Sequence, residues 1–403
     1  MRIHIFINCH WNEGISGGDK RVLEIMRRWK DVSNLEMYVY TSESFYHLMQ
    51  TEGVIEKTKR PVNVAGITYK SNGSIRIVLT DTNVKAGEGI IKTYWKRTFS
   101  AIHLVKEYFE EGDYLYSPTD ILPDVYPAYV MKKANPSSRW TMTTYHIFEK
   151  FYKRPGNIVV NFLSCTQQKM AIKMGLKFAD SYPTISPVVL DEFNSKYPKK
   201  SDIFFLSGNA VDTEEVEAAA LDVEGYDAVF LARLNYSKGI FELPEIWSRV
   251  VARKQDAVLA LMGKGTPEIT EELKTKIKEC KMEDHIKLFG YVENEFAHST
   301  MKKSKMFLFT SHEEGWGMAL AESLLCDIPV VAYDLPVFRA LFPEGTVLCP
   351  LKDVDAMADA VVDLLEDNEK RDRLGKAGHE YVKSHYSWDK TAEDEMKFIT
   401  GSI

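Results

Sequence analysis

The sequence predicts an α/β protein of two doubly wound domains, and three observations support this prediction. Its 403 residues are roughly two to three times the usual length of one domain. Its composition, 45% apolar and 27% charged, is ordinary for a packed globular protein and excludes collagen-like and disordered classes. Short β-branched or aromatic runs alternate with longer amphipathic stretches in both halves, which is typical of parallel strands joined by helices.

The expected elements follow in order along the chain. Strand-like runs in the first half are Ile3–Asn8, Leu35–Tyr40, Ile75–Leu79, Tyr114–Ser117, Trp140–Tyr145, Pro183–Ser186 and Ile203–Ser207. Those in the second half are Ala228–Ala232, Ala257–Met262, Ile286–Phe289, Met306–Thr310, Pro329–Tyr333 and Thr346–Cys349. Helical patterns include Arg21–Trp29, Gly239–Lys254, Pro267–Lys281, Gly317–Cys326, Val354–Glu366 and Trp388–Phe398.

The join between the domains is predicted near Gly208–Gly225, where an acidic, alanine-rich stretch carries no strand signal. This gives an N-terminal domain of residues 1–208 and a C-terminal domain of residues 209–386. Two such domains facing each other would place the carboxyl ends of their strands, and hence their ligand sites, along a central cleft. That geometry suits an enzyme with two substrates.

Charge and cysteine content narrow the function classes. The formal net charge of −7 argues against general nucleic-acid binding. The five cysteines are widely spaced with no CxxC pair, which argues against a disulfide framework or a structural zinc site and favours a reducing compartment. No apolar run approaches the roughly 18 residues that cross a bilayer, and the first nine residues do not resemble a signal peptide. We therefore expect a cytoplasmic protein.

The strongest local signal is the run from Ser311 to Glu322, which follows a strand and opens a helix. Gly315 and Gly317 would let backbone amides and the helix N-terminus approach an anion such as a diphosphate. Carboxylates only accept hydrogen bonds, so Glu314 and Glu322 beside that anion suggest hydroxyl groups of ribose and sugar. The alternative is a solvated loop acid and a charge on a helix face.

A second cluster, from Arg233 to Gly239, also lies between a strand and a helix. Arg233 and Lys238 could neutralise the charge that builds on a departing diphosphate. They could equally be rim charges of an ordinary loop. The glycine turns at Gly263 and at Gly290, before Tyr291 and Val292, are weaker signals.

In the first half, a glycine-rich loop from Gly14 to Gly18 lies between a strand and a helix. It lacks the full GxGxxG spacing, so it indicates close approach of a phosphate rather than a dinucleotide cofactor. His146 ends the strand Trp140–Tyr145, where its side chain would project into the cleft. A lone histidine can also be a core or surface group.

Taken in order, these motifs resemble family 4 retaining glycosyltransferases. The resemblance spans both halves of the chain. The Glu314-Gly-Trp-Gly-Met run is similar to the family's E-G-F-G-L turn, and Asn209-Ala-Val-Asp212 is similar to its N-G-V-D hinge. Where the family usually has a Gly-Gly pair after the next strand, this chain has Tyr333-Asp-Leu-Pro336, as in branches that transfer mannose or glucose to lipid-linked acceptors.

The resemblance implies a GT-B fold, with two Rossmann-like domains and a C-terminal segment, residues 387–403, that crosses back to the first. It implies that Arg233 and Lys238 hold the diphosphate of a GDP- or UDP-linked sugar, that Glu322 binds the ribose and Glu314 the sugar. The catalytic set would be His146, Glu314, Arg233 and Lys238, with no metal and no cofactor. The donor-binding set would be Gly17, Gly18, Arg233, Lys238, Gly263, Tyr291, Val292, Glu314, Gly315, Trp316, Gly317, Met318 and Glu322.

The segment from Met131 to Ala179 is strongly basic, with nine Lys or Arg and one acid, Glu149. Lysines four residues apart share one helix face and would attract an anionic bilayer or a polyprenyl phosphate. A patch from Lys92 to Phe99 also combines cations with aromatic residues. The cations expected at a membrane or acceptor are Lys150, Lys153, Arg154, Lys169, Lys173 and Lys177. The alternative is an ordinary solvated basic face.

The leading hypothesis is a metal-independent retaining transferase that moves a hexose, of mannose or glucose type, from a nucleotide-diphosphate sugar to a saccharide or lipid-linked saccharide. One rival is a soluble glycosyltransferase that builds a storage or small-molecule glycoside. Another is a non-catalytic module that binds sugar nucleotides or membranes. A GT-B epimerase would instead isomerise a free sugar with no acceptor.

Overall fold

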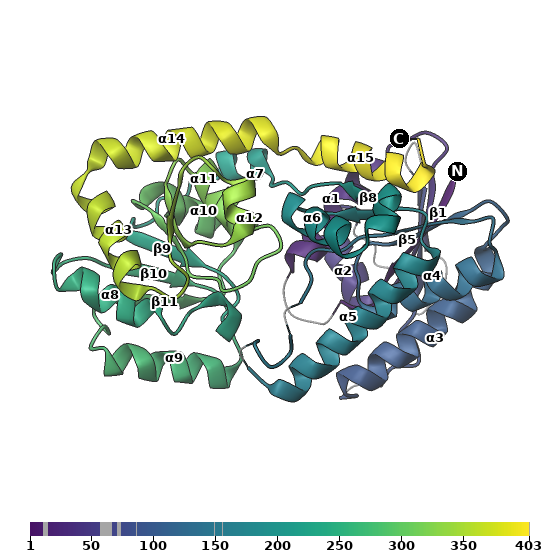
Figure 1. Cartoon of the computed structure of the whole chain (residues 1–403), viewed down its shortest axis with the longest axis horizontal. Helices are drawn as coiled ribbons and strands as arrows, with labels where there is room; N and C mark the ends of the chain where they lie inside the picture. The colour runs from purple at the N-terminus through teal and green to yellow at the C-terminus, as the bar shows by residue number, and fades with distance from the viewer. Residues whose placement is uncertain are drawn as a thin grey trace. The chain divides into compact units, whose positions relative to one another are not determined.

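A computed structural model describes residues 1–10, 15–56, 67–70, 74–85, 87–148, 150–154 and 156–402. The chain divides into two compact units (Figure 1). The first comprises Met1–Lys153, Asn157–Asn209 and Trp388–Ile403, and the second comprises Arg154–Gly156 and Ala210–Ser387. The sequence prediction divided the chain at 208/209 and did not assign Arg154–Gly156 to the second unit.

The first unit is built on a six-stranded sheet with the order β3-β4-β2-β1-β5-β6. Neighbouring strands are parallel except β3, which pairs antiparallel with β4 at one edge. A two-stranded parallel ladder, β7-β8, joins β6 through single bridges. The strands are β1 (Arg2–Ile7), β2 (Glu36–Thr41), β3 (Ile67–Lys70), β4 (Ser74–Leu79), β5 (Tyr114–Ser117), β6 (Arg139–Met142), β7 (Tyr182–Thr184) and β8 (Phe204–Leu206).

Helices cover both faces of this sheet because alternate strand residues point to opposite sides. Ile3, Ile5 and Ile7 of β1 pack into one hydrophobic cluster with α1, α2 and α15. Phe6 packs into the other cluster, with α3, α4 and α5. The helices are α1 (Gly17–Trp29), α2 (Glu43–Thr51), α3 (Ile90–Tyr108), α4 (Leu122–Ala134), α5 (Ile158–Phe178), α6 (Pro187–Lys196) and α15 (Trp388–Thr400), with a 3₁₀ turn at Pro198–Ile203.

A buried ion pair attaches the C-terminal helix α15 to the first unit. The side chains of Arg21 on α1 and Glu395 on α15 are both 0% exposed, and Arg21 Nη2 lies 2.8 Å from Glu395 Oε2. Glu395 also accepts hydrogen bonds from Ser207, Tyr116 and Thr143. Because this carboxylate of α15 accepts hydrogen bonds from several elements of the first unit, α15 is an integral part of that unit.

The second unit has a fully parallel six-stranded sheet with the order β11-β10-β9-β12-β13-β14. Numbered within the unit, this is the 3-2-1-4-5-6 order of a dinucleotide-binding fold, in which ligands bind where the winding reverses, between β9 and β12. The strands are β9 (Ala228–Leu231), β10 (Leu259–Met262), β11 (Ile286–Gly290), β12 (Phe307–Phe309), β13 (Val330–Tyr333) and β14 (Thr346–Cys349).

Eight helices and one short turn accompany the strands of the second unit in the described part of the chain. Amphipathic α8 places Ile246, Trp247 and Val250 in the hydrophobic core. The helices are α7 (Thr213–Ala218), α8 (Leu243–Val251), α9 (Pro267–Glu279), α10 (Asn294–Lys303), α11 (Met318–Leu325), α12 (Pro336–Leu341), α13 (Val354–Glu366) and α14 (Asn368–His385), with a 3₁₀ turn at Tyr236–Lys238.

The predicted α/β class with two doubly wound sheets is confirmed, but some boundaries differ. The helix predicted from Gly239 begins at Leu243, because Gly239 has a left-handed conformation (φ 64°) that ends the turn before it. The edge strand β3 was not predicted. Among the described residues, no helix is both long and apolar enough to span a bilayer.

Candidate functional site

An ion pair lies where the winding of the second sheet reverses. Lys238, in the turn after β9, pairs with Glu314, in the loop after β12, and both side chains are largely buried. Ser311 Oγ donates a further hydrogen bond to Glu314 Oε1 at 2.8 Å. Two residues predicted as a catalytic cation and a sugar-binding acid thus meet directly. A diphosphate that binds Lys238 would compete with Glu314 for its charge.

The loops after β9 and β12 are joined through their backbones. Thr310 Oγ1 donates to the carbonyl of Lys238 at 2.8 Å, and the amide of His312 donates to the carbonyl of Ser237 at 2.8 Å. A Cβ at Gly239 would lie 2.1 Å from the carbonyl oxygen of Thr310, so only glycine permits this approach. The Lys238 backbone is therefore fixed relative to the strand end that carries Glu314.

The N-terminus of α11 is open to an anion. Gly317 caps the helix with φ 110° and provides no side-chain hydrogen bond, so the first amides of α11 lack a side-chain cap. Such amides and the helix dipole favour negative charge. Gly315 and Met318 are partly exposed here, whereas Trp316 is 2% exposed and packs on Phe342 and Tyr386. Trp316 would therefore contribute to a ligand site through its backbone, not through its ring.

Arg233 and Glu322 belong to the segments that follow β9 and β12 of the second unit. Arg233 follows β9, is exposed, and has no hydrogen bond or ion pair with any residue that the structure describes. Glu322 projects from α11 with its side chain 23% exposed, and its Oε2 lies 3.9 Å from Nε2 of buried His298. Arg233 can offer a ligand an exposed cation, and Glu322 can offer a partly exposed acceptor for hydroxyl hydrogen bonds.

The loops after β10 and β11 form the other edge of this region. Gly263 has φ 145°, and a Cβ there would lie 1.8 Å from the carbonyl oxygen of Ala232. The Gly263 amide donates to the carbonyl of Gly290 at 2.7 Å. Tyr291 is 63% exposed, and Val292 is partly exposed. This edge therefore offers backbone groups and one aromatic ring.

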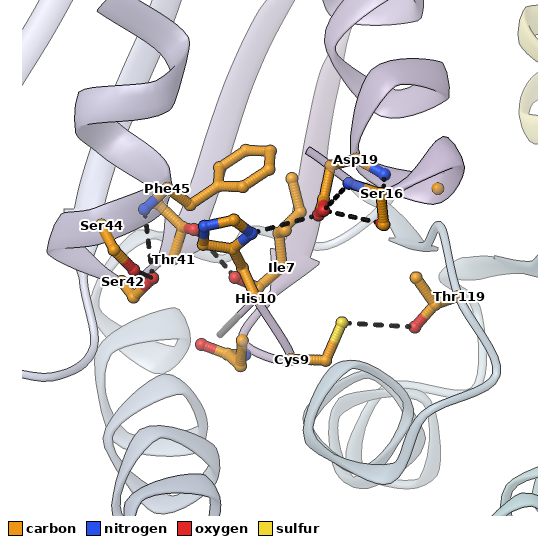
Figure 2. A network of polar contacts seen from close by, with 12 residues as sticks. Ile7, Cys9, His10, Ser16, Asp19, Thr41, Ser42, Ser44, Phe45 and Thr119 are labelled. Carbon is orange, nitrogen blue, oxygen red and sulfur yellow. Dashed lines mark hydrogen bonds and ion pairs between the residues drawn. The ribbon is translucent and has the colours of Figure 1, made fainter. Parts of the chain in front are cut away.

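In the first unit, the N-terminus of α1 carries a polar cluster, which Figure 2 shows. Ser16 Oγ accepts from the Asp19 amide at 3.1 Å while Asp19 Oδ2 accepts from the Ser16 amide at 2.9 Å, which forms a capping box before and within the Gly17-Gly18 turn. His10 Nδ1 lies 3.3 Å from Asp19 Oδ1. Burial favours the neutral acid, but the hydrogen bonds from His10 and Ser16 hold the pKa of Asp19 below its ordinary value.

His146 is held through its backbone. It follows β6, is partly exposed, and its ring makes an edge contact with Phe148 at 4.8 Å. Buried Gln168 of α5 donates to the His146 carbonyl at 2.8 Å and accepts from the Phe148 amide at 2.9 Å. Gln168 also donates to Oδ2 of Asp120 at 2.8 Å, and burial raises the pKa of Asp120 to about 7.

Sequence reasoning missed several of these residues. The Ser16-x-x-Asp19 spacing is a recognisable capping-box signal that could have found Asp19. Nothing in the sequence pattern marks Asp120 and Gln168, which lie 48 residues apart. Gly14 and Glu149, named in the sequence predictions, lie outside the described residues.

The predicted basic residues differ in their surroundings. Lys150, Lys153 and the three α5 lysines (Lys169, Lys173 and Lys177) are exposed. Arg154 instead has a side chain 16% exposed and pairs with Glu313 of the second unit at 2.8 Å. Arg154 is therefore engaged within the second unit and is not part of the exposed basic surface.

Within the described part of the chain, none of the five cysteines forms a disulfide bond. No group of three or more His, Cys, Asp or Glu side chains is placed there to hold a metal ion. The groups that the region around β9 and β12 offers to a ligand are fixed cations, backbone amides and carboxylates. Such a set can bind a diphosphate and the hydroxyl groups on either side of it.

Comparison with known proteins adds sequence likeness in the second unit. Residues 211–381 match the family described as glycosyl transferases group 1. The chain is 27% identical to the poly(glycerol-phosphate) alpha-glucosyltransferase of Bacillus subtilis over 46% of its own length and 28% of that protein. It is 31% identical to N-acetylgalactosamine-N,N'-diacetylbacillosaminyl-diphospho-undecaprenol 4-alpha-N-acetylgalactosaminyltransferase of Campylobacter jejuni, over 51% of this chain and 54% of that protein. The matches thus span about half the length of such relatives or less.

Solved structures share the fold across the whole chain. Anabaena Alr3699/HepE, in complex with UDP-glucose, superposes with a TM-score of 0.73 and 13% identity over 100% of both chains. Sucrose-phosphate synthase from Thermosynechococcus elongatus superposes with a TM-score of 0.72 and 15% identity, over 99% of this chain and 98% of that one. At these identities the likeness is one of fold.

Proposed function

We propose that the chain is a retaining hexosyltransferase, because residues 211–381 match the glycosyl transferases group 1 family and the two Rossmann-like units have the GT-B fold. It moves a hexose of mannose or glucose type from a nucleotide-diphosphate sugar to a hydroxyl group of an acceptor. One observation carries this proposal: Lys238 and Glu314 meet where the β9 and β12 loops join, beside the open N-terminus of α11.

The donor binds to the second unit. Its diphosphate is held by Lys238, by Arg233 and by the amides from Gly315 to Met318, because these groups offer positive charge without a proton to lose. Glu322 accepts hydrogen bonds from the ribose hydroxyls, and Glu314 from the sugar. The likeness to a fold that holds UDP-glucose in HepE supports a nucleotide sugar, UDP- or GDP-linked, as donor.

In the transfer, the anomeric carbon exchanges its bond to a diphosphate oxygen for a bond to the acceptor oxygen. The proton of the acceptor hydroxyl leaves with the nucleoside diphosphate. Negative charge accumulates on the departing diphosphate, and Lys238 and Arg233 stabilise it electrostatically. Lys238 releases Glu314 as it meets the diphosphate, and the freed carboxylate then binds the sugar. We assign His146, of the first unit, to contact with the sugar in this reaction.

The acceptor is a saccharide or a lipid-linked saccharide, and it binds the first unit. The names of two relatives support a saccharide or a polymer at a membrane: one refers to poly(glycerol-phosphate) and the other to a diphospho-undecaprenol. The reaction takes place on the cytoplasmic side, where nucleotide sugars are made. Transfer needs no divalent metal, because the two cations neutralise the leaving group.

A panel of GDP- and UDP-linked hexoses tests this proposal. A true donor raises the melting temperature and is slowly hydrolysed without an acceptor. With an acceptor panel of free and lipid-linked saccharides, the product should keep the anomeric configuration of the donor. If Arg233→Ala is included in the panel, Arg253→Ala is its matched control. Arg253 is an exposed arginine of the same unit that pairs with Asp359 away from the proposed site.

Two results would overturn the proposal. One is a panel in which no sugar nucleotide stabilises or is hydrolysed by the folded protein. The other is a product of inverted configuration, which would require a different arrangement of nucleophile and leaving group. A donor that binds but is never turned over, with any acceptor, would instead favour a non-catalytic binding module.

A further inference from the structure

Large apolar side chains are exposed together on two helices of the first unit. On α3, Ile90, Ile91, Trp95 and Phe99 are between 43% and 58% exposed, and the rings of Trp95 and Phe99 stack at 5.6 Å. At the start of α5, Ile158, Val159, Val160, Phe162 and Leu163 are between 46% and 61% exposed. We call these nine residues the helix-tip surface. Such clustering is unusual, because scattered single apolar residues are the norm on protein surfaces.

The two groups lie on the same side of the first unit, because both helices flank α4. On α5, Gln167 Oε1 accepts from the amide of Leu122, so the start of α4 is level with Gln167. At the far end, Lys132 of α4 lies 2.9 Å from Asp180, just past the end of α5. The two helices are therefore parallel, and the turns of α5 before Gln167 project beyond the start of α4.

The start of α3 projects in the same direction. Tyr94 donates to the carbonyl of Cys9 at 2.7 Å, and the amide of Cys9 donates to Asp124 in the first turn of α4 at 3.0 Å. The far end of α3 packs by the start of β2, where the rings of Tyr108 and Tyr38 lie 5.6 Å apart. Figure 1 shows α3 and α5 as long helices that run in the same direction.

Exposed cations accompany the apolar residues on both helices: beyond the apolar run on α5, and within it on α3. Helix α5 contains no acidic residue, and Lys169, Lys173 and Lys177 are exposed on it. Lys169 is six residues beyond Leu163, a rise of about 9 Å. On α3, Lys92 has a side chain 69% exposed and lies 3.5 Å from Glu88, a 9% exposed acid that also pairs with Lys96 at 2.6 Å. The helix-tip surface is thus bordered on α5 by three exposed lysines, and on α3 it contains one exposed lysine.

We propose that the helix-tip surface inserts into an anionic lipid bilayer, with the lysines of α5 and α3 at the headgroups. An interfacial helix buries its apolar side about 5–10 Å deep, and the apolar run from Ile158 to Leu163 rises about 7.5 Å, so Lys169 lies beyond the inserted part. Each lysine near an anionic surface adds attraction that salt screens. A protein partner would meet the same apolar residues, but the three exposed lysines of α5, a helix that contains no acidic residue, favour anionic lipid. This inference does not depend on the transfer reaction.

Trp95 provides the first test. The other described tryptophans are at most 3% exposed, and only Trp11 lies outside the described residues. On vesicles with phosphatidylglycerol, the emission of Trp95 should shift to shorter wavelength, and lipids brominated on the acyl chain should quench it. Trp95→Phe should abolish both signals while vesicle binding persists. A signal unchanged in Trp95→Phe, or no quenching of the wild type, would refute insertion of this surface.

Flotation with vesicles provides the second test. Phe162→Glu/Leu163→Glu should weaken partitioning onto phosphatidylglycerol vesicles at least about tenfold, since it places charge at the inserted tip. The matched control is Leu351→Glu, an equally apolar residue of the second unit that is 47% exposed. Replacing Lys169, Lys173 and Lys177 with Gln should remove the preference for anionic over zwitterionic vesicles. All substituted residues are exposed, and circular dichroism should show unchanged folding.

Three outcomes would contradict the proposal. The wild-type protein could fail to float with anionic vesicles. The double variant could float as well as Leu351→Glu. Light scattering could show a dimer that Phe162→Glu/Leu163→Glu dissociates, with no vesicle binding by either protein, in which case the helix-tip surface joins two copies of the chain.

Discussion

Removal of the Glu395 carboxylate should destabilise the first unit severely. Glu395→Ala leaves the guanidinium of Arg21 buried at 0% exposure without its counter-charge, and removes the acceptor for Tyr116 at 2.6 Å and Thr143 at 2.9 Å. Breaking a buried ion pair by removing one partner costs about 3–5 kcal/mol. With a urea dependence of about 2 kcal/mol/M, the unfolding midpoint of this unit should fall by about 2 M.

Urea titration followed by tryptophan fluorescence measures this change, because Trp29 donates to the Ala392 carbonyl of α15 and reports on this junction. The control is Glu393→Ala on the same helix. The Glu393 side chain is 67% exposed, so its removal should change the free energy of unfolding by less than about 0.5 kcal/mol. If Glu395→Ala shifts the midpoint no more than Glu393→Ala, the buried pair does not hold α15. Replacing both Arg21 and Glu395 with Met should recover much of the loss, because no buried charge remains.

Four further outcomes follow from the sites. Lys238→Ala should lower kcat about 10²- to 10³-fold with little change in donor Kd, because Lys238 stabilises the leaving group. Steady-state kinetics and calorimetry measure the two constants, and an equal loss in kcat and in donor affinity would contradict this role. Glu322→Ala should instead weaken nucleotide binding about tenfold by calorimetry, since it loses charged hydrogen bonds to ribose. Treatment with EDTA should leave the transfer rate intact, and loss of activity restored by Mg²⁺ would count against transfer by fixed cations alone. Burial raises the pKa of Asp120 from 3.8 to about 7. The unfolded chain therefore releases this proton at a lower pH than the folded chain, and the free energy of unfolding should fall as the pH rises from about 4 to 7. In thermal melts over this range, Asp120→Asn should remove the pH dependence.

The contribution of Glu395 to stability depends on pH in the opposite direction to that of Asp120. Burial alone would raise its pKa, but the charge of Arg21 and the hydrogen bonds it accepts outweigh burial and hold the pKa below its ordinary value. The stability it contributes is therefore present above about pH 4.5 and is lost as the pH falls. Acid melts of Glu395→Ala should accordingly differ least from wild type at low pH.

Strand and helix order could be predicted from the sequence where apolar runs are short and well separated. The strand Thr346–Cys349 and the helix Val354–Glu366 were predicted with the bounds that the structure has. The edge strand β3 (Ile67–Lys70) was missed, although Asn72-Gly73 after it is a dipeptide typical of hairpin turns. Since Thr346–Cys349 is itself an edge strand, the miss reflects sequence and not position: the run Ile67–Lys70 is less apolar and ends in a lysine.

The site was predictable in part for a different reason. Lys238 and Glu314 could be proposed because each follows a strand, and neighbouring strand ends meet at one edge of a parallel sheet. Their direct pairing was not predicted, since spacing along the chain does not reveal which side chains touch. Gln168 was not predicted for the same reason. It bonds to Asp120, 48 residues away in the sequence, and to the carbonyl of His146, 22 residues away. Such links depend on tertiary packing and leave no local signature.

The place of α15 has a consequence for biosynthesis. Arg21 is made near the beginning of the chain and Glu395 lies 374 residues later. While the ribosome translates the intervening residues, the nascent first unit carries a core cation that has no carboxylate to neutralise it. That unit can therefore reach its final stability only once α15 has been translated, has left the exit tunnel and has docked.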